Sequence, residues 1–264
     1  MARIDFEVVN CFAAEDFAGN PMCVIRDPVE GRLMGRIAAQ MGCTLTIFPV
    51  RTGPSSYSMR MFTTRIEVPF GGSASLAGAW AMGEGRWTQT TSGGVVETEF
   101  ADGKGWTGQP DPHVAPILDD EVAAAIGLNT VEGLFLGSAS GNHHVVAVTS
   151  DDPAEFAPRA DLLERVARRH SGATVGAVRR IDPGEVHGRI FTPLHGRLED
   201  PAVGGGAPTI ACIMRDHFGG ASRCVVRQGE EMGRPSRMEV ELVPGQIRVG
   251  GFVRKAAEGV LLVE

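Results

Sequence analysis

The chain has 264 residues, of which 43% are hydrophobic and 22% charged, a composition typical of globular proteins and a length sufficient for two small lobes. The formal net charge is −7 and the arginines and lysines are scattered, which argues against a nucleic-acid partner. No apolar run approaches the ~18 residues of a membrane span and the N-terminus lacks a signal-peptide core, so we expect a cytoplasmic protein with no membrane partner.

Hydrophobic periodicity along the chain predicts more strands than helices. We expect strands near 3–12, 22–26, 46–50, 57–63, 95–100, 133–138, 144–149, 174–181 and 186–192, with three more after Arg223. Helices are expected near 31–41, 74–82, 120–127, 160–170 and 207–218. Residues 83–94 are turn-rich, and the Gly/Pro/Asp-rich segment 101–116 is expected to link an N-terminal lobe (1–115) to a C-terminal lobe (116–264), leaving open whether the last strand returns to the first lobe.

The cysteines indicate neither a disulfide framework nor a metal site. They are five in number and contain no C-x-x-C pair: Cys11, Cys23, Cys43, Cys212 and Cys224. We therefore expect reduced thiols and no bound metal.

Two segments of the first half recur in the second half. Gly19-Asn20-Pro21 and Gly141-Asn142-His143 each precede an apolar run. Phe62-Thr63 with Glu67-Val68-Pro69 is echoed by Phe191-Thr192 with Glu199-Asp200-Pro201, and both lead through glycines into an apolar helix. The matches occur in the same order, which favours gene duplication over chance.

The glycine-rich turns are candidate binding elements for a small carboxylate. They comprise Gly71, Gly72 and Ser73 in the first repeat and Gly204, Gly205 and Gly206 in the second, and Asn20 is added to this set of candidate substrate-binding residues. A helix start preceded by glycines presents unpaired amides and the positive end of the helix dipole, so two such turns could face one acid across a cleft. The alternative is that each glycine pair only allows a tight strand-to-helix turn.

Asp200 is a candidate acid/base, because it stands directly before the second turn, where helix-start amides favour its ionised form. Its alternative role is to cap that turn.

On these residues the chain resembles the PhzF family, phenazine-biosynthesis-like isomerases with the diaminopimelate epimerase fold. The matching stretches are Gly19–Pro21, Phe62–Thr63, Glu67–Pro69, Gly72–Ser75, Glu199–Ala202, Gln228–Ser236 and Val249–Gly251. The resemblance implies an α+β fold of two pseudo-symmetric lobes, each a mixed, mostly antiparallel sheet wrapped around a central helix. It also implies a homodimer without cofactor that moves protons in small carboxylates.

Three departures from the family pattern affect the expected chemistry. Leu45 stands where the isomerases carry a proton-moving glutamate, Ser73 replaces a histidine, and Asn10 replaces an aspartate. Leucine cannot accept a proton, so either another group serves or the chemistry is lost. The candidates are Asp200 alone, one of His143 and His144 on an alternating strand, and Cys43, whose alternative is a small buried hydrophobe.

Two functions remain from this reasoning. The first is a cofactor-independent isomerase that shifts a proton and a double bond in a small unsaturated carboxylic or amino acid of an antibiotic-type pathway, with an alkylproline precursor as a family-based candidate. The second is a catalytically inactive small-acid binding or scaffold protein of the same fold. A diaminopimelate-type epimerase is disfavoured, because neither glycine turn contains cysteine.

Overall fold

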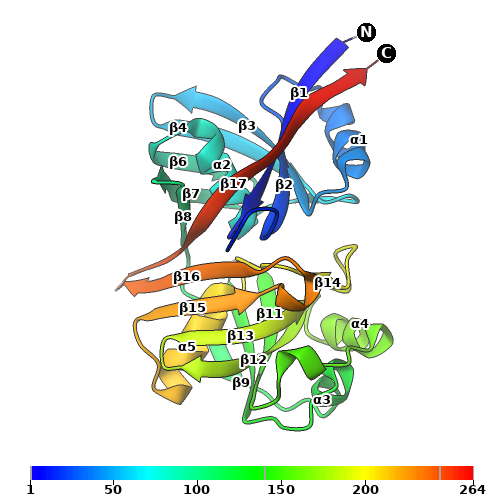
Figure 1. Cartoon of the computed structure of the whole chain (residues 1–264), viewed down its shortest axis with the longest axis vertical. Coiled ribbons are helices and arrows are strands. Elements are labelled where there is room, and N and C mark those ends of the chain that lie inside the picture. Colours follow the sequence, from blue (N-terminus) through cyan, green and yellow to red (C-terminus); the bar gives the residue numbers. More distant parts are fainter. Residues whose placement is uncertain (1, 140, 244, 264) are drawn as a thin grey trace. The chain divides into compact units, whose positions relative to one another are not determined.

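The computed structural model describes residues 2–139, 141–243 and 245–263, and the chain divides into two units (Figure 1). Unit 1 contains Met1–Gly108 and Gly250–Glu264, and unit 2 contains Gln109–Val249. The predicted boundary at residues 115 and 116 falls at the end of strand β9 (His113–Pro116), which pairs with β10 inside unit 2.

Unit 1 is a sheet of nine strands among its described residues, with two helices. Its elements are β1 (Ala2–Cys11), β2 (Asn20–Val24), α1 (Gly31–Met41), β3 (Leu45–Gly53), β4 (Ser56–Phe62), β5 (Glu67–Val68), α2 (Gly72–Met82), β6 (Gly85–Thr91), β7 (Gly94–Ala101), β8 (Lys104–Gln109) and most of β17 (Gln246–Val263). β2–β3 and β4–β6 are parallel, whereas β1–β2, β3–β4, β4–β5, β6–β7 and β7–β8 are antiparallel. β17 pairs with both β8 and β1, and runs alongside β1 in Figure 1. The strands of unit 1 therefore close on themselves.

Helix α2 is the core of unit 1. Its sequence GSASLAGAWAM has no charged residue, and Gly72–Ala79 are all buried. A helix that is apolar on every face must be surrounded by protein, and α2 contacts β1, β2, β3, β4, β6 and β7. Small residues allow this close approach, because a Cβ at Gly78 would lie 2.8 Å from the Tyr57 hydroxyl.

Unit 2 contains seven longer strands and the short β14, with three α-helices among its described residues. Its elements are β9, α3 (Glu121–Ile126), β10 (Gly133–Ala139), β11 (Asn142–Thr149), the 3-10 turn η1 (Pro153–Glu155), α4 (Ala160–Arg169), β12 (Thr174–Asp182), β13 (Glu185–Phe191), β14 (Glu199–Asp200), α5 (Ala207–Phe218), β15 (Arg223–Gln228), η2 (Glu230–Met232) and β16 (Ser236–Val243). α5 packs against β9, β10, β15 and β16, and Ala207–Met214 are buried.

The pairing scheme of unit 1 recurs in unit 2. Along the chain, β10–β11 is antiparallel, β11–β12 is parallel, β12–β13 and β13–β14 are antiparallel, β13–β15 is parallel and β15–β16 is antiparallel. Strands β1 to β7 of unit 1 show the same succession of antiparallel and parallel pairs. The short strands also share one register, since Met61 pairs with Val68 and Ile190 with Asp200. This agreement supports the internal repeat seen in the sequence, and it makes Val68 the unit 1 counterpart of Asp200.

Two segments expected to be irregular contain strands. Residues 83–94 are not only turns, because they contain β6. Residues 101–116 do contain the junction between the units, at Gly108 and Gln109, but they form β8 and β9. The reason is that buried positions of these strands carry polar side chains such as Gln89 and Thr107, which hide the apolar alternation. Over the described ranges, no helix is long and apolar enough to span a bilayer.

Candidate active site

The glycine turn of unit 1 joins β5 to α2. Gly71 is the extended residue before the helix, and its carbonyl accepts from the Ser75 amide at 2.9 Å and the Ser75 hydroxyl at 3.2 Å. A Cβ at Gly71 would lie 2.9 Å from Leu45 Cδ1. The position of the expected glutamate is therefore filled by a leucine methyl packed directly against the turn.

Asn20, Gly72 and Ser73 lie at the same turn. Asn20 Nδ2 donates to Ser73 Oγ at 3.4 Å, and both side chains are buried. The structure thus brings together the unit 1 residues that the sequence predicted for substrate binding, and that role stays a prediction.

A chain of buried hydrogen bonds fixes the first turn of α2. Gln89 Nε2 donates to Ser75 Oγ at 3.0 Å, the Tyr57 hydroxyl donates to Gln89 Oε1 at 2.7 Å, and Thr98 Oγ1 lies 3.3 Å from the same hydroxyl. Burial raises the pKa of Tyr57, so this phenol remains a donor. The chain links α2 to β4, β6 and β7.

The glycine turn of unit 2 precedes α5. The Gly204 amide donates to the Ala202 carbonyl at 3.1 Å, and the Gly206 amide donates to the Val203 carbonyl at 2.9 Å. Two buried glutamines fix this turn: Gln109 Nε2 donates to the Gly204 carbonyl at 3.1 Å, and Gln228 Oε1 accepts from the Val203 amide at 2.9 Å.

Asp200 lies at the end of β14 and is half-buried. Its Oδ1 accepts from the Ala202 amide at 2.9 Å, which is the local Asp turn expected of a residue before proline. This contact realises the capping alternative, and it also holds the carboxylate beside the glycine turn. A role in proton transfer stays a prediction.

Of the two adjacent histidines, His144 lies at the glycine turn. It is 5% exposed, its Nδ1 is 2.8 Å from Thr174 Oγ1, and a Cβ at Gly206 would lie 3.2 Å from the same nitrogen. Burial lowers the pKa of His144 to about 4, with a further decrease from neighbouring histidines and an opposing effect of the Gly205 backbone, so the ring is neutral at pH 7. His143, the other histidine that the sequence offered, alternates to the other face of β11 and is half-buried, and a catalytic role for it stays a prediction.

Cys43 lies between α1 and β3, where it packs against the apolar cluster that includes Ile37, Phe48 and Phe62. This environment fits the small-hydrophobe alternative. A catalytic role for Cys43 stays a prediction.

Gln109, Thr174 and Gln228 are the site residues that the sequence reasoning missed. A signal existed for Gln228, since it opens the stretch Gln228–Ser236 that carried much of the family resemblance. In the structure Gly229 has φ +77°, and a Cβ there would lie 2.9 Å from the Pro201 carbonyl oxygen. This stretch is therefore packed against the Asp200 turn.

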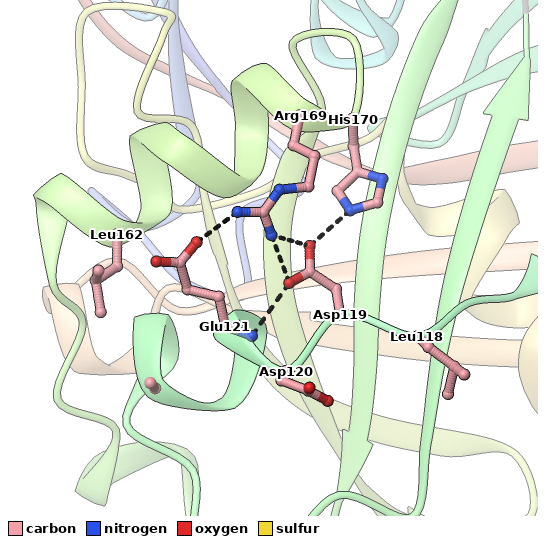
Figure 2. A pocket seen from close by; sticks show the side chains of 8 residues that line it. Leu118, Asp119, Asp120, Glu121, Leu162, Arg169 and His170 are labelled. Atoms are coloured by element: carbon pink, nitrogen blue, oxygen red, sulfur yellow. Dashed lines mark hydrogen bonds and ion pairs between the residues drawn. The ribbon is translucent and has the colours of Figure 1, made fainter.

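A separate open pocket of about 680 Å³ lies beside α3 and α4 (Figure 2). None of its lining residues belongs to either glycine turn. Arg169 donates to both Asp119 oxygens at 2.7 and 2.8 Å and to Glu121 at 2.7 Å, and His170 Nε2 is 2.9 Å from Asp119. Although burial alone would raise it, these hydrogen bonds lower the pKa of Asp119 overall. Asp119, Glu121, Arg169 and His170 are thus bonded to one another and hold the start of α3 to the end of α4.

Solved structures of other proteins share this fold. A *Bacillus anthracis* protein of the PhzF family superposes with a TM-score of 0.87 at 21% identity over 100% of both chains. A hydroxyproline epimerase from *Agrobacterium vitis* gives 0.61 at 12% identity over 98% of this chain and 92% of the other. The fold is thus shared by PhzF proteins and an amino-acid epimerase.

The family itself follows from the sequence. The profile of PhzC-PhzF, phenazine biosynthesis-like protein, matches residues 9–251, so the chain belongs to this family of isomerases and the resemblance is confirmed. It is 27% identical to the uncharacterized isomerase YddE of *Escherichia coli* K12, over 92% of this chain and 93% of that protein. It is 29% identical to trans-2,3-dihydro-3-hydroxyanthranilate isomerase of *Pseudomonas aeruginosa*, over 88% of each chain.

Proposed function

We propose that this protein is a cofactor-independent isomerase that moves a proton, and with it a double bond, within a small unsaturated carboxylic or amino acid. The observation that carries the proposal is a carboxylate, Asp200, held by a hydrogen bond beside a turn of three successive glycines at the start of α5. The family membership and the name of the *Pseudomonas* relative support the same reaction class.

The glycine turn supplies the electrostatic part of the reaction. The first amides of a helix lack an intrahelical acceptor, and glycines keep side chains away from them. Since the Gly204 and Gly206 amides donate to carbonyls within the turn and Pro208 has no N–H, this role falls to the amides of Gly205 and Ala207. Such amides stabilise a substrate carboxylate and the negative charge that develops when a proton leaves the adjacent carbon. Gln109 and Gln228 fix the turn before substrate arrives, so little reorganisation is required.

Asp200 supplies the proton transfer. In its ionised form it accepts a proton from one carbon of the conjugated acid, and in its protonated form it returns that proton to another carbon. Leu45 takes no part in this step, because its methyl groups cannot exchange protons. A single carboxylate acting in both steps adds and removes the proton on one face of the substrate, so we expect a suprafacial product.

The two units are proposed to be pseudo-symmetric lobes of the diaminopimelate epimerase type, with α2 and α5 as their central helices, as the recurring strand pairings suggest. We also propose a homodimer, and a place in an antibiotic-type pathway with an alkylproline precursor as one candidate substrate.

The test is proton exchange with solvent. The protein is incubated in D₂O with trans-2,3-dihydro-3-hydroxyanthranilate, and in parallel with small conjugated dienoic acids, while deuterium incorporation is followed by NMR. We expect incorporation by the wild type and a loss of about 10²- to 10⁴-fold in Asp200→Asn.

The matched control is Asp152→Asn. Asp152 also precedes a Pro-Ala pair, and its Oδ1 accepts from the Ala154 amide at 3.0 Å, so this variant makes the same change in the same kind of local turn outside the glycine site, where the asparagine oxygen can still accept from that amide. Wild-type activity in Asp200→Asn would remove Asp200 from its role. Binding of the acids without any labelling would favour the inactive binding protein instead.

A further inference from the structure

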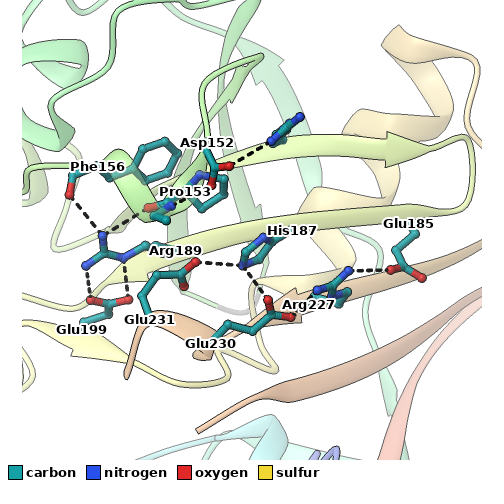
Figure 3. A network of polar contacts seen from close by, with 12 residues as sticks. Asp152, Pro153, Phe156, Glu185, His187, Arg189, Glu199, Arg227, Glu230 and Glu231 are labelled. Atoms are coloured by element: carbon teal, nitrogen blue, oxygen red, sulfur yellow. Dashed lines mark hydrogen bonds and ion pairs between the residues drawn. The ribbon is translucent and has the colours of Figure 1, made fainter. Parts of the chain in front are cut away.

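The strand that carries Asp200 contains only two residues, and its neighbour Glu199 is anchored by Arg189 of β13 (Figure 3). Arg189 Nε donates to Glu199 Oε1 at 2.9 Å and Nη2 donates to Oε2 at 2.8 Å. The side chains are only 12% and 13% exposed. This is the two-pronged geometry in which a guanidinium fixes both the position and the orientation of a carboxylate.

The third nitrogen of Arg189 is also used. Nη1 donates to the carbonyls of Pro153 at 3.3 Å and Phe156 at 3.1 Å, the first residue of η1 and the residue that follows it. The guanidinium is therefore held from three directions, and it fixes Glu199 relative to the edge of β13 and the η1 turn. Because the Arg189 guanidinium is restrained in this way, it cannot move together with β14, and it therefore holds that strand in place.

The anchor acts directly on Asp200 through the backbone. Successive side chains of a strand point to opposite faces, so fixing Glu199 on one face directs Asp200 to the other. On the far side, Pro201 is covered by Gly229, and Val203 is held by Gln228. The chain is thus fixed on both sides of Asp200, at Glu199 before it and at Pro201 and Val203 after it.

Unit 1 contains an equivalent arginine–glutamate pair, but the residue after its glutamate is not an acid. Arg60 donates from Nε and Nη2 to the two oxygens of Glu67, each at 2.7 Å. Both Arg60 and Arg189 also lie over the ring of a phenylalanine two residues further along the chain, at 5.2 Å from the ring centroid for Arg60 and 5.5 Å for Arg189. The residue after Glu67 is Val68. The unit 1 pair is more exposed, at 48% and 37%. The repeat therefore supplies an internal comparison for the pair beside Asp200.

We propose that Arg189 and Glu199 are positioning residues for Asp200: their buried two-pronged contact holds β14 so that Asp200 stays on the Ala202 amide, beside the glycine turn. This inference rests on the proposed function for its catalytic meaning. Its structural content, the restraint of Asp200, can be measured without substrate.

The experiment uses charge-neutral double variants. Arg189→Met with Glu199→Gln removes the contact in unit 2 without leaving an unpaired charge, and Arg60→Met with Glu67→Gln does the same in unit 1. Hydrogen exchange of the Ala202 amide, resolved by NMR, reports the bond to Asp200. We expect exchange about 10-fold or more faster in the unit 2 variant, with the amides of β11 and β12 unchanged, and a wild-type rate at Ala202 in the unit 1 variant.

Turnover is measured on the same proteins with trans-2,3-dihydro-3-hydroxyanthranilate. A misplaced catalytic group affects kcat more than KM, so we expect kcat to fall about 10- to 100-fold in the unit 2 variant with KM nearly constant, and no such fall in the unit 1 variant. Glu199→Gln alone, which keeps the side-chain volume, is expected to give the same pattern more weakly and serves if the double variant does not fold.

Unchanged Ala202 exchange in folded unit 2 variants would overturn the inference, as would equal losses of kcat in both double variants. Absence of turnover of both trans-2,3-dihydro-3-hydroxyanthranilate and the conjugated dienoic acids by the wild type would refute the proposed function, while faster Ala202 exchange in the unit 2 variant alone would still establish the restraint.

Discussion

Replacing Gly78 by alanine tests the packing around the middle of α2. In most helices this change stabilises by about 0.5–1 kcal/mol, because alanine loses less backbone freedom on folding. At Gly78 the new methyl carbon would lie 2.8 Å from the Tyr57 hydroxyl, 3.1 Å from Tyr57 Cε2 and 3.0 Å from Met59 Sδ. Contacts this short require the neighbours to move.

Tyr57 has little freedom to move, because it is fully buried and its hydroxyl donates to Gln89 at 2.7 Å. Overpacking of a core costs about 1–3 kcal/mol, and weakening one buried hydrogen bond adds about 1 kcal/mol. Subtracting the helix gain leaves a net destabilisation of about 1–3 kcal/mol for Gly78→Ala.

Gly35 offers a matched control in the same unit. It lies in the middle of α1, is exposed, and the nearest atom to a new Cβ is Phe62 Cδ1 at 3.9 Å. Gly35→Ala should therefore stabilise by about 0.5–1 kcal/mol, which is opposite in sign to Gly78→Ala.

Urea unfolding followed by circular dichroism measures both free energies. Tyr57 is the single tyrosine of the chain, so its NMR signal in tyrosine-labelled protein reports the local displacement directly. A Gly78→Ala protein as stable as Gly35→Ala, with an unmoved tyrosine signal, would refute this account of the α2 packing.

Two further predictions concern the glycine turn of unit 2. Since burial lowers the pKa of His144 from 6.5 to about 4, the unfolded chain takes up a proton that the folded protein excludes, so stability falls as pH decreases from 6.5 towards 4, by up to roughly 3 kcal/mol. Chemical denaturation of wild type and His144→Gln at pH 4.5 and 7 measures this, and an equal pH dependence in both proteins would contradict it. Gln228→Met keeps the volume but cannot accept from Val203, so it should lose about 1–3 kcal/mol in denaturant unfolding, whereas Gln246→Met at an exposed position should change little. Equal stability of the two methionine variants would show that the Val203 contact contributes nothing.

The parts of the fold and site that follow from local chemistry could be predicted from the sequence. Glycines before an apolar helix, and a Glu-x-Pro segment before those glycines, appear twice, and the structure repeats their strand pairings in the same register. The apolar pattern of α2 likewise predicts its burial, because a helix without a polar face has no side suited to water.

The remaining site residues depend on contacts between distant parts of the chain. Gln109 meets Gly204 across 95 positions, and His144 meets Thr174 across 30. These side chains are polar and stand in strands, so neither apolar periodicity nor a local turn signal distinguishes them from solvent-facing residues. Only the pairing of parallel β11 and β12 shows why His144, rather than His143, reaches the turn.

Strand β17 has a consequence for how the protein is made. Unit 1 is assembled from both ends of the chain, since β1 pairs along its length with a segment that begins about 240 residues later. At roughly 5–20 residues synthesised per second, β17 emerges from the ribosome on the order of 10–50 s after β1, and until then the edge of β1 that pairs with β17 stays unpaired. Unit 2 is continuous and can mature during that interval, whereas a message truncated before residue 250 would release a product with an unprotected strand, prone to associate with other chains.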